Sequence, residues 1–394
     1  MTLVGAAPGH FRRPAGNPTI QWRMTKGAFV SWVRSCGRSQ GFIDALGLTP
    51  IYSSYLRQSD VVSAPLKYGP QFIETLRRLH QHRPEVIFVM NPPVFAVAAV
   101  AIYAAQAGAK YVMDCHSGAF EGRKWRWSLP LQRAFGRRAA AVIVTNPVHE
   151  NLVKAWPARA MIIADPPPKL ATSFPDAPAQ GGREIDDQGF VFVIATYGPD
   201  EAIPEVIEAA RALPQVRFRV SGDTARAPRA VLERCPPNVQ LTGFVPLETF
   251  WQHVRPASAV LTLTQRENTI LRGGWEAMFT GRPLITSDTA ALRGYFVRGT
   301  RFVDNTFAGI KAGIEDVLAN QATYQADMKR LDAEKRLLWL RQQEELSLLI
   351  TGTHVAEAGH PDRDVVAAGG IAGKDHARNR PAVSPGDAAV RIDG

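Results

Sequence analysis

Two glycines and a glutamate within residues 264–288 (TQRENTILRGGWEAMFTGRPLITSD) have a spacing suited to a phosphorylated ligand. Apolar runs flank the segment, so we expect a strand, a loop and a helix that begins at Gly273 and Gly274. Glycines at a helix N-terminus let an oxyanion approach the free backbone N–H groups, and the helix dipole adds attraction. Glu276, one turn further on, can accept hydrogen bonds from two vicinal hydroxyls. A diphosphate and a ribose held in this way describe a nucleotide-sugar site; the alternative is that the glycines only allow close packing.

Other loops are expected at the same cleft. Gly198 and the turn containing Gly222 and Asp223 each follow a predicted strand, and a glycine lets the backbone approach a phosphate closely. Arg266 and Arg272 flank the paired glycines, and either can pair with a departing diphosphate. The alternative for each arginine is an ordinary place on the surface.

A second candidate site lies in the first half of the chain. Asp114 ends a predicted strand, residues 110–114, and His116 follows it. Open α/β sheets bind ligands at the carboxyl ends of their strands. A histidine there can donate to a transferred sugar or take a proton from an acceptor hydroxyl, while Asp114 orients it or is the base itself. Otherwise Asp114 caps the next turn and His116 is merely exposed.

A basic and aromatic segment follows, GRKWRWSLPLQRAFGRR at residues 122–138. Tryptophans beside cations suit the membrane interface, where rings lie at headgroup depth and cations contact anionic lipid. Stacking on nucleic-acid bases and an amphipathic core helix with a solvated basic face are the alternatives. We favour the membrane and expect no nucleic acid. The residues expected at the membrane or a lipid-borne acceptor are Arg123, Lys124, Trp125, Arg126 and Trp127.

Charge is distributed unevenly along the 394 residues. The net charge is +10, and residues 1–168 hold 20 Lys and Arg against 8 Asp and Glu, so all the excess lies in the first half. This asymmetry predicts an anionic partner for that half. The three cysteines show no metal-ligand spacing, which indicates a reduced, cytoplasmic setting. We expect neither a signal peptide nor a membrane-spanning segment.

The predicted elements alternate between strand and helix, which indicates an α/β fold with parallel sheets. We expect a first Rossmann-like domain at 1–168, a linker at 169–188, a second such domain at 189–322, a long helix at 323–350 and a disordered tail at 351–394. Within the first domain, residues 2–7 are expected to form a strand and residues 29–46 a helix.

The second half resembles the GT-B glycosyltransferases, above all the large retaining family with two glutamates eight positions apart. Glu276 matches the second glutamate; Asn268 stands at the position of the first, with Glu267 one place before it. This resemblance implies two Rossmann-like domains with a cleft between them and a last helix that returns to the first domain. It also implies catalysis without a bound metal. The one Asp-x-Asp, Asp362 to Asp364, lies in the expected tail, and no cofactor is expected.

The first half is similar to the dolichol-linked chitobiose β-1,4-mannosyltransferases. The resemblance is carried by Asn91-Pro92-Pro93, by Asp114-Cys115-His116-Ser117 and by the pair Asp200-Glu201. Cys115 and Ser117 depart from the Trp and Asn of that family. If the similarity extends to mechanism, the reaction inverts and needs a base, for which Asp114 or His116 is the candidate. If the two-glutamate retaining family is the closer relative, no such base is required.

These resemblances imply a glycosyltransferase that moves a hexose from a UDP- or GDP-sugar to a polyprenyl-diphosphate-linked saccharide. The expected place is the inner face of the cell membrane, as a peripheral protein in bacterial exopolysaccharide or surface glycan assembly. A sugar-nucleotide epimerase on the same fold and a non-catalytic scaffold are the alternatives. An NAD-dependent dehydrogenase is disfavoured because no Gly-x-Gly-x-x-Gly follows a strand with an acidic residue about 20 positions on.

Overall fold

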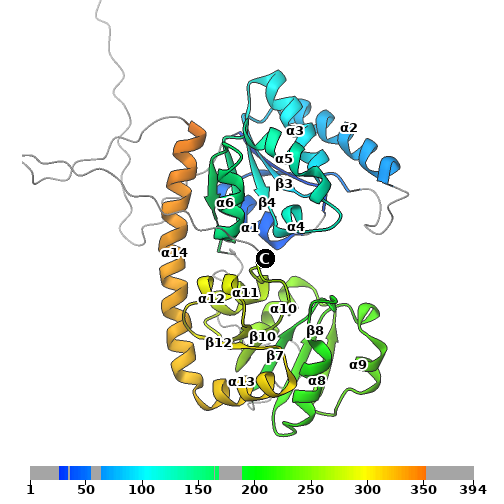
Figure 1. The fold of residues 1–394 in the computed structure, drawn as a ribbon, viewed down its shortest axis with the longest axis vertical. Coiled ribbons are helices and arrows are strands. Elements are labelled where there is room, and N and C mark those ends of the chain that lie inside the picture. The colour runs from blue at the N-terminus through cyan, green and yellow to red at the C-terminus, as the bar shows by residue number, and fades with distance from the viewer. Residues whose placement is uncertain (1–25, 34–35, 55–63, 164, 168–188, 352–394) are drawn as a thin grey trace, which may run out of the picture. The chain divides into compact units, whose positions relative to one another are not determined.

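The computed structural model describes residues 26–33, 36–54, 64–163, 165–167 and 189–351, and these form two parallel sheets of six strands each (Figure 1). The expected strand at 2–7, the linker at 169–188 and, beyond Thr351, the tail lie outside the described residues. Among the described residues, no helix combines the length and the apolar character needed to cross a bilayer.

The first sheet has the strand order β2-β1-β3-β4-β5-β6 and is parallel throughout. Its strands are β1 Gly27–Ser31, β2 Thr49–Tyr52, β3 Val86–Asn91, β4 Lys110–Cys115, β5 Ala141–Val144 and β6 Ala160–Ile162. The helices between them are α1 Gly37–Leu46, α2 Ala64–His82, α3 Val94–Ala107, α4 Ser117–Phe120, η1 Arg126–Ser128, α5 Leu129–Gly136 and α6 Pro147–Lys154.

The second sheet has the order β12-β11-β10-β7-β8-β9 and is also parallel. Its strands are β7 Phe190–Ile194, β8 Arg217–Ser221, β9 Val239–Gly243, β10 Ala259–Thr262, β11 Leu284–Ser287 and β12 Thr300–Val303. Its helices are α8 Ile203–Arg211, η2 Thr224–Arg226, α9 Arg229–Glu233, α10 Leu247–Val254, α11 Arg272–Phe279, α12 Ala290–Tyr295 and α13 Phe307–Ala319.

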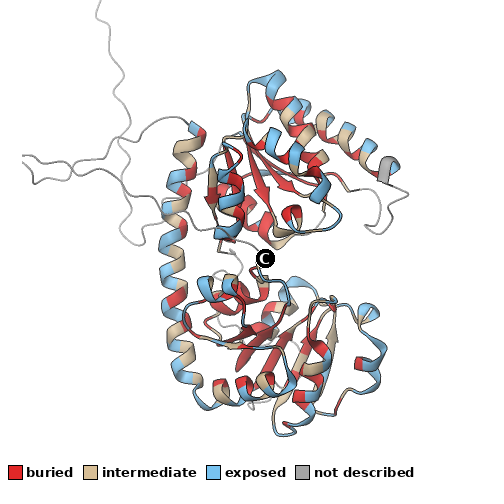
Figure 2. Cartoon of the chain, in the orientation of Figure 1, coloured by how far each residue is buried: buried red, intermediate tan, exposed pale blue. Residues whose placement is uncertain are grey.

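The inner strands of both sheets are buried on both faces, and β1, β3, β7 and β10 are accordingly near-continuous apolar runs (Figure 2). Alternate residues of one strand pack into cores on opposite faces of the sheet. In β3, Ile87 and Val89 pack on one side of the sheet and Phe88 and Met90 on the other. The helices supply the second layer of each core, as expected for a doubly wound α/β fold.

The last helix, α14 Gln321–Thr351, contributes to the cores of both sheets. Met328 and Leu331 pack in a core of the second sheet, whereas Trp339 lies against Phe42 of α1 with ring centroids 5.9 Å apart. Near its end, Gln342 Nε2 donates to the carbonyl of Ile162 over 2.6 Å. The predicted return of the C-terminal helix to the first domain is confirmed.

Three sequence-based assignments of secondary structure need correction. The expected helix at 29–46 is wrong, because residues 27–31 form β1 and the helix begins only at Gly37. Since β1 is buried on both faces, its run of apolar residues has no alternation that would distinguish it from a helix. The sequence analysis also missed α12, because that helix has only 6 residues. It missed β12 because this edge strand has partly exposed residues.

Candidate functional site

The first sheet reverses its strand order between β1 and β3, and a hollow of about 460 Å³ lies there. Ligands of open α/β sheets bind at such a switch point. We call it the aromatic hollow. The loops after β1, β3 and β4 and the start of α2 supply its lining: Trp32, Val33, Lys67, Tyr68, Gln71, Met90, Pro92, Pro93, His116, Gly118, Lys124 and Trp125.

A second cavity, of about 170 Å³, is lined by residues from both sheets' loops, and we call it the inter-sheet cavity. It is bounded by Cys36, Arg38, His116, Ser117, Thr145, Asp165, Ile270, Arg272 and Trp275. His116 lines both this cavity and the aromatic hollow. The imidazole therefore stands where contents of the two spaces would meet.

Asp114 and His116, predicted from their place after a strand, lie together in the structure. His116 Nε2 is 3.5 Å from Asp114 Oδ2, and neither atom has a hydrogen-bond partner among the described residues. The other oxygen, Oδ1, accepts from Arg38 Nε over 2.9 Å. Burial opposes ionisation of this carboxyl, but the charge of Arg38 and the contact with His116 outweigh burial and lower the pKa of Asp114 to about 2. Asp114 is thus a fixed anion beside the imidazole.

Arg38 and Arg272 share a second carboxylate, that of Asp165. Arg38 Nη1 donates to Asp165 Oδ1 over 3.0 Å, and Arg272 Nη1 pairs with Asp165 Oδ2. Arg272 comes from the second domain's α11, so this pair ties the loops of the two sheets together. A Cβ at Gly37 would lie 2.3 Å from the Arg272 guanidinium carbon, so Gly37 makes room for the arginine.

Glu276, the expected ribose ligand, is buried beside the same cluster. Its Oε1 lies 3.2 Å from Arg272 Nε, one helical turn back. Burial raises the pKa of Glu276 to about 7, with Arg272 opposing the shift and Asp165 adding to it. The carboxyl group of Glu276 lies next to charged groups. With a pKa of about 7 it is half ionised near neutral pH. Its contact with a ribose remains a prediction.

The paired glycines have a clear packing role. A Cβ at Gly274 would lie 2.5 Å from the ring of Phe296, which is fully buried, and one at Gly273 would lie 3.1 Å from the side chain of Thr262. The close-packing alternative therefore describes what both glycines do in this structure. Binding of a diphosphate at the N-terminus of α11 remains a prediction.

In the second sheet, the direction in which strands are added changes between β7 and β10. Hydrogen bonds join the loops that follow these two strands. Asp200 accepts through Oδ1 from Arg266 Nη2 over 2.8 Å and through Oδ2 from the Thr264 hydroxyl over 2.7 Å. Gly198 lies in the same loop, where a Cβ would come within 3.1 Å of the Asp200 carboxylate. The structure thus brings Gly198 and Arg266, both predicted donor ligands, to one switch point.

The remaining predicted donor residues have structural partners. Glu267 Oε1 accepts from the backbone N–H of Ala290 over 2.8 Å, at the start of α12. The carbonyl of Asn268 accepts from Asn146 Nδ2 over 2.7 Å.

Gly222 and Asp223 follow β8. Gly222 has φ +121°, and a Cβ there would lie 2.4 Å from the carbonyl oxygen of Ala195, so the turn requires glycine. The carboxylate of Asp223 accepts from Ala225 N–H over 3.1 Å and caps η2.

The predicted membrane residues lie beside the aromatic hollow. Trp125 lines it and contacts the rings of Tyr68, Phe95 and Trp127 at centroid distances of 6.0, 6.2 and 6.4 Å. Trp127 is 57% exposed. Arg123, Lys124 and Arg126 are exposed around these rings.

Several residues of the site were missed by the sequence analysis, notably Arg38, Asp165, Lys67, Trp32 and Trp275. Arg38 was assigned to the middle of a helix that in fact begins one residue before it. Asp165 was placed at the end of the first domain, without a role. The one local signal for Asp165 is its position just after the last strand of the first sheet, where a carboxylate can reach a ligand site.

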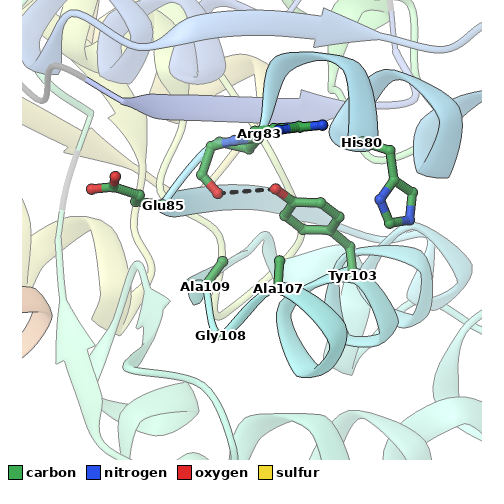
Figure 3. Close-up of a pocket in the computed structure, with 8 residues that line it drawn as sticks. His80, Arg83, Glu85, Tyr103, Ala107, Gly108 and Ala109 are labelled. Carbon is green, nitrogen blue, oxygen red and sulfur yellow. Dashed lines mark hydrogen bonds between the residues drawn. The ribbon is translucent and has the colours of Figure 1, made fainter.

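A hollow of about 380 Å³ between His80, Arg83, Tyr103 and Gly108 lies at the opposite, amino-terminal ends of β3 and β4 (Figure 3). There Tyr103 Oη of α3 donates to the Pro84 carbonyl over 3.3 Å, which ties α3 to the segment before β3. Within the described ranges, no group of three or more His, Cys, Asp or Glu side chains could hold a metal ion. Asp362 and Asp364 lie outside those ranges.

Comparison with known proteins supports the class. Residues 30–164 match the family model of the Glycosyl transferase 4-like domain. No curated protein matches the chain in sequence. Among solved structures, HepE of Anabaena in complex with UDP-glucose has a TM-score of 0.62 at 14% identity, covering 83% of this chain and 100% of that one. Sucrose-phosphate synthase from Thermosynechococcus elongatus has a TM-score of 0.60 at 15% identity, covering 77% and 83%.

The same fold occurs in a proposed UDP-N-acetylglucosamine 2-epimerase from Listeria monocytogenes, with a TM-score of 0.58 at 10% identity, covering 85% of this chain and 98% of that one. At such identities the solved structures establish the fold, which is GT-B. The family match supplies the activity class. Together they confirm the predicted class, a glycosyltransferase with the GT-B fold.

Proposed function

We propose that the protein transfers a hexose from a UDP- or GDP-sugar to a saccharide carried on a polyprenyl diphosphate. The observation that carries this proposal is that His116 lines both cavities. The donor sugar would enter the inter-sheet cavity, and the acceptor would lie in the aromatic hollow. The acceptor hydroxyl and the sugar carbon that it attacks would then meet at the imidazole.

The Asp114–His116 pair is suited to moving a proton at that point. Asp114 faces Nε2, which leaves Nδ1 of His116 to accept the proton of the acceptor hydroxyl. The oxygen forms its bond to the anomeric carbon as the bond to the diphosphate breaks, and the electron pair leaves with the nucleoside diphosphate. Asp114, an anion at neutral pH, stabilises the imidazolium that forms. In a retaining reaction, His116 would instead donate to a hydroxyl of the transferred sugar.

Arg272 is the group best placed to stabilise the departing diphosphate. It lines the inter-sheet cavity, its side chain is 35% exposed, and it begins α11, whose N-terminus adds a favourable dipole. To bind phosphate oxygens it would exchange part of its contact with Asp165. Glu276, behind it on the same helix, would take the ribose hydroxyls.

A peripheral place on an anionic membrane, within exopolysaccharide or surface glycan assembly, belongs to the same proposal. The helices α2, α3 and α5 pack side by side (Figure 1). Together with η1 they carry exposed apolar side chains. These are Leu66, Ile73, Ile102, Trp127 and Leu131, which are 42–76% exposed. Exposed cations adjoin them at Arg123, Lys124 and Arg126. An apolar surface edged by cations suits the headgroup region of anionic lipid.

The experiment is a product assay with UDP- and GDP-linked hexoses, run with and without a prenyl-diphosphate-linked saccharide. Transfer only in the presence of the lipid-borne acceptor is the expected outcome. A sugar-nucleotide epimerase is the second candidate, favoured by the fold shared with the Listeria protein. It would change the donor sugar without any acceptor, which NMR of the nucleotide sugar detects.

A further inference from the structure

The aromatic hollow holds a buried cation for which the sequence analysis had no role. Lys67, near the start of α2, is only 8% exposed and lines the hollow. Among the described residues it has no carboxylate or other anionic partner, and its Nζ lies 5.8 Å from the ring centroid of Tyr68. Removing an ammonium group from water without a counter-ion costs free energy. A lysine that is buried, lines a hollow and has no anionic partner within the described ranges therefore indicates an anionic ligand.

Lys124 adds a second positive charge to the same space. It also lines the hollow, it is exposed, and its Nζ lies 5.7 Å from the ring centroid of Trp125. Burial lowers the pKa of Lys67, and the charge of Lys124 lowers it further. Two like charges are thus held close together, an arrangement that a multivalent anion relieves and a neutral sugar does not.

The rest of the lining restricts what the anion is attached to. Trp32 and Tyr68 stack at 5.9 Å, and Trp125 extends this row of rings toward the exposed Trp127. The hollow is also lined by His116 and by Gln71, whose buried Oε1 has no hydrogen-bond partner among the described residues. The lining therefore combines two cations with apolar rings and with polar groups.

We propose that Lys67 and Lys124 bind the diphosphate of a prenyl-linked acceptor, with the prenyl chain on the row of aromatic rings and the saccharide directed to Gln71 and His116. This inference rests on the proposed transfer to a lipid-borne acceptor and identifies the residues that recognise its diphosphate. The same phosphate chemistry occurs in anionic phospholipid headgroups, so the test has to separate the two sources.

The test is a titration of intrinsic tryptophan fluorescence, because Trp32 and Trp125 line the hollow. The full chain is titrated with farnesyl diphosphate, with farnesol, with inorganic pyrophosphate and with phosphatidylglycerol vesicles. We expect farnesyl diphosphate to bind best, Lys67→Met to weaken it at least tenfold, and Lys124→Met to weaken it less because that side chain is exposed. Lys67→Arg, which keeps the positive charge, should retain most of the wild-type affinity for farnesyl diphosphate. Lys154→Met, which removes an exposed lysine of α6 paired with Glu150, should change nothing.

Equal binding of farnesyl diphosphate by the wild-type protein and both methionine variants overturns the proposal. So does a loss confined to phosphatidylglycerol vesicles, which would assign the lysines to a phospholipid headgroup. Circular dichroism and UDP binding verify that the variants are folded, and if Lys67→Met does not fold, Lys124→Met and Lys67→Arg decide the outcome. If the wild-type protein binds no nucleotide, the function proposed above is wrong. The farnesyl diphosphate titration still decides separately whether Lys67 and Lys124 bind a diphosphate.

Discussion

Asp114 and His116 face each other across 3.5 Å at the carboxyl end of β4, while Arg38 holds the other oxygen of the same carboxylate. This arrangement fixes the carboxylate as an anion beside a histidine that lines both cavities. The proposed chemistry depends on that relationship.

Asp114→Asn is expected to lower the turnover number about 10²-fold or more, the scale of lost acid–base assistance. The amide keeps the shape but does not stabilise a protonated His116. Steady-state kinetics measure this, with Asp44→Asn as the control, since Asp44 is a partly exposed carboxylate of α1. Nucleotide affinity should change little, and an unchanged turnover number would contradict the role of Asp114. Because Arg38 loses one of its two counter-charges, urea unfolding should show a loss of stability as well.

Glu276 is expected to make the protein less stable as the pH rises from about 4.5 to 7. The folded state keeps the proton of Glu276 up to a pKa of about 7, whereas the unfolded chain loses it near the ordinary value of 4.5. The folded state therefore binds more protons in this window, and the free energy of unfolding falls by at most about 3 kcal/mol across it. Urea unfolding of the wild-type protein and Glu276→Gln measures the difference, which should vanish below pH 4.5. Parallel curves for the two proteins between pH 5 and 7 would show that Glu276 titrates normally.

Glu276→Ala is expected to weaken the donor complex, raising the KM for the nucleotide sugar about tenfold or more through lost hydrogen bonds to the ribose. The folded state should persist, because the variant removes a carboxyl whose burial is costly. Kinetics with the nucleotide-sugar donor test this. Wild-type KM and turnover in a folded variant would remove Glu276 from the donor site.

Gly274→Ala is expected to destabilise the protein by about 1–3 kcal/mol, because the new methyl group would press on the buried ring of Phe296. Gly294→Ala in α12 is the matched control, since nothing lies within 4 Å of its Cβ position. That change should be neutral or stabilising, as alanine favours a helix over glycine. Thermal unfolding compares the two variants, and equal melting temperatures would mean that the α11 glycines are not required for packing.

Replacing Trp127, Arg123 and Arg126 together by serine is expected to abolish binding to anionic liposomes while leaving nucleotide binding intact. The variant removes an exposed ring and two exposed cations from one surface. Vesicle co-sedimentation measures this, with Phe244→Ser, an 86% exposed aromatic residue after β9, as the control. Persistent binding of the triple variant would assign the basic first half to another partner.

Much of the fold was predictable because its inner strands are buried apolar runs and because glycines and prolines separate many of the elements. The apolar run of α3 ends at Ala107, and Gly108 follows it in the left-handed conformation that is typical of a glycine C-cap. β1 was mistaken for a helix because a short apolar run has no period of its own. β12 was missed because it is an edge strand that carries an exposed arginine.

The candidate site was only partly predictable. Asp114, His116 and Arg272 stand beside recognisable strand ends or helix starts, so local patterns indicate them. Arg38 and Asp165 form an ion pair although they are 127 positions apart in the chain, and no local spacing predicts such a pair. Lys67 was missed for a related reason: a lysine in a helix is ordinarily solvated. Only the three-dimensional structure reveals that this one is buried, with no counter-ion in the part of the chain that the structure describes.

The most direct test is the transfer rate of His116→Ala with UDP- and GDP-hexose donors and a prenyl-diphosphate-linked saccharide, measured beside nucleotide affinity. Because His116 lines both cavities, we predict that turnover falls about 10²- to 10⁴-fold while nucleotide affinity stays within about twofold. Wild-type turnover in a folded His116→Ala protein would contradict the account.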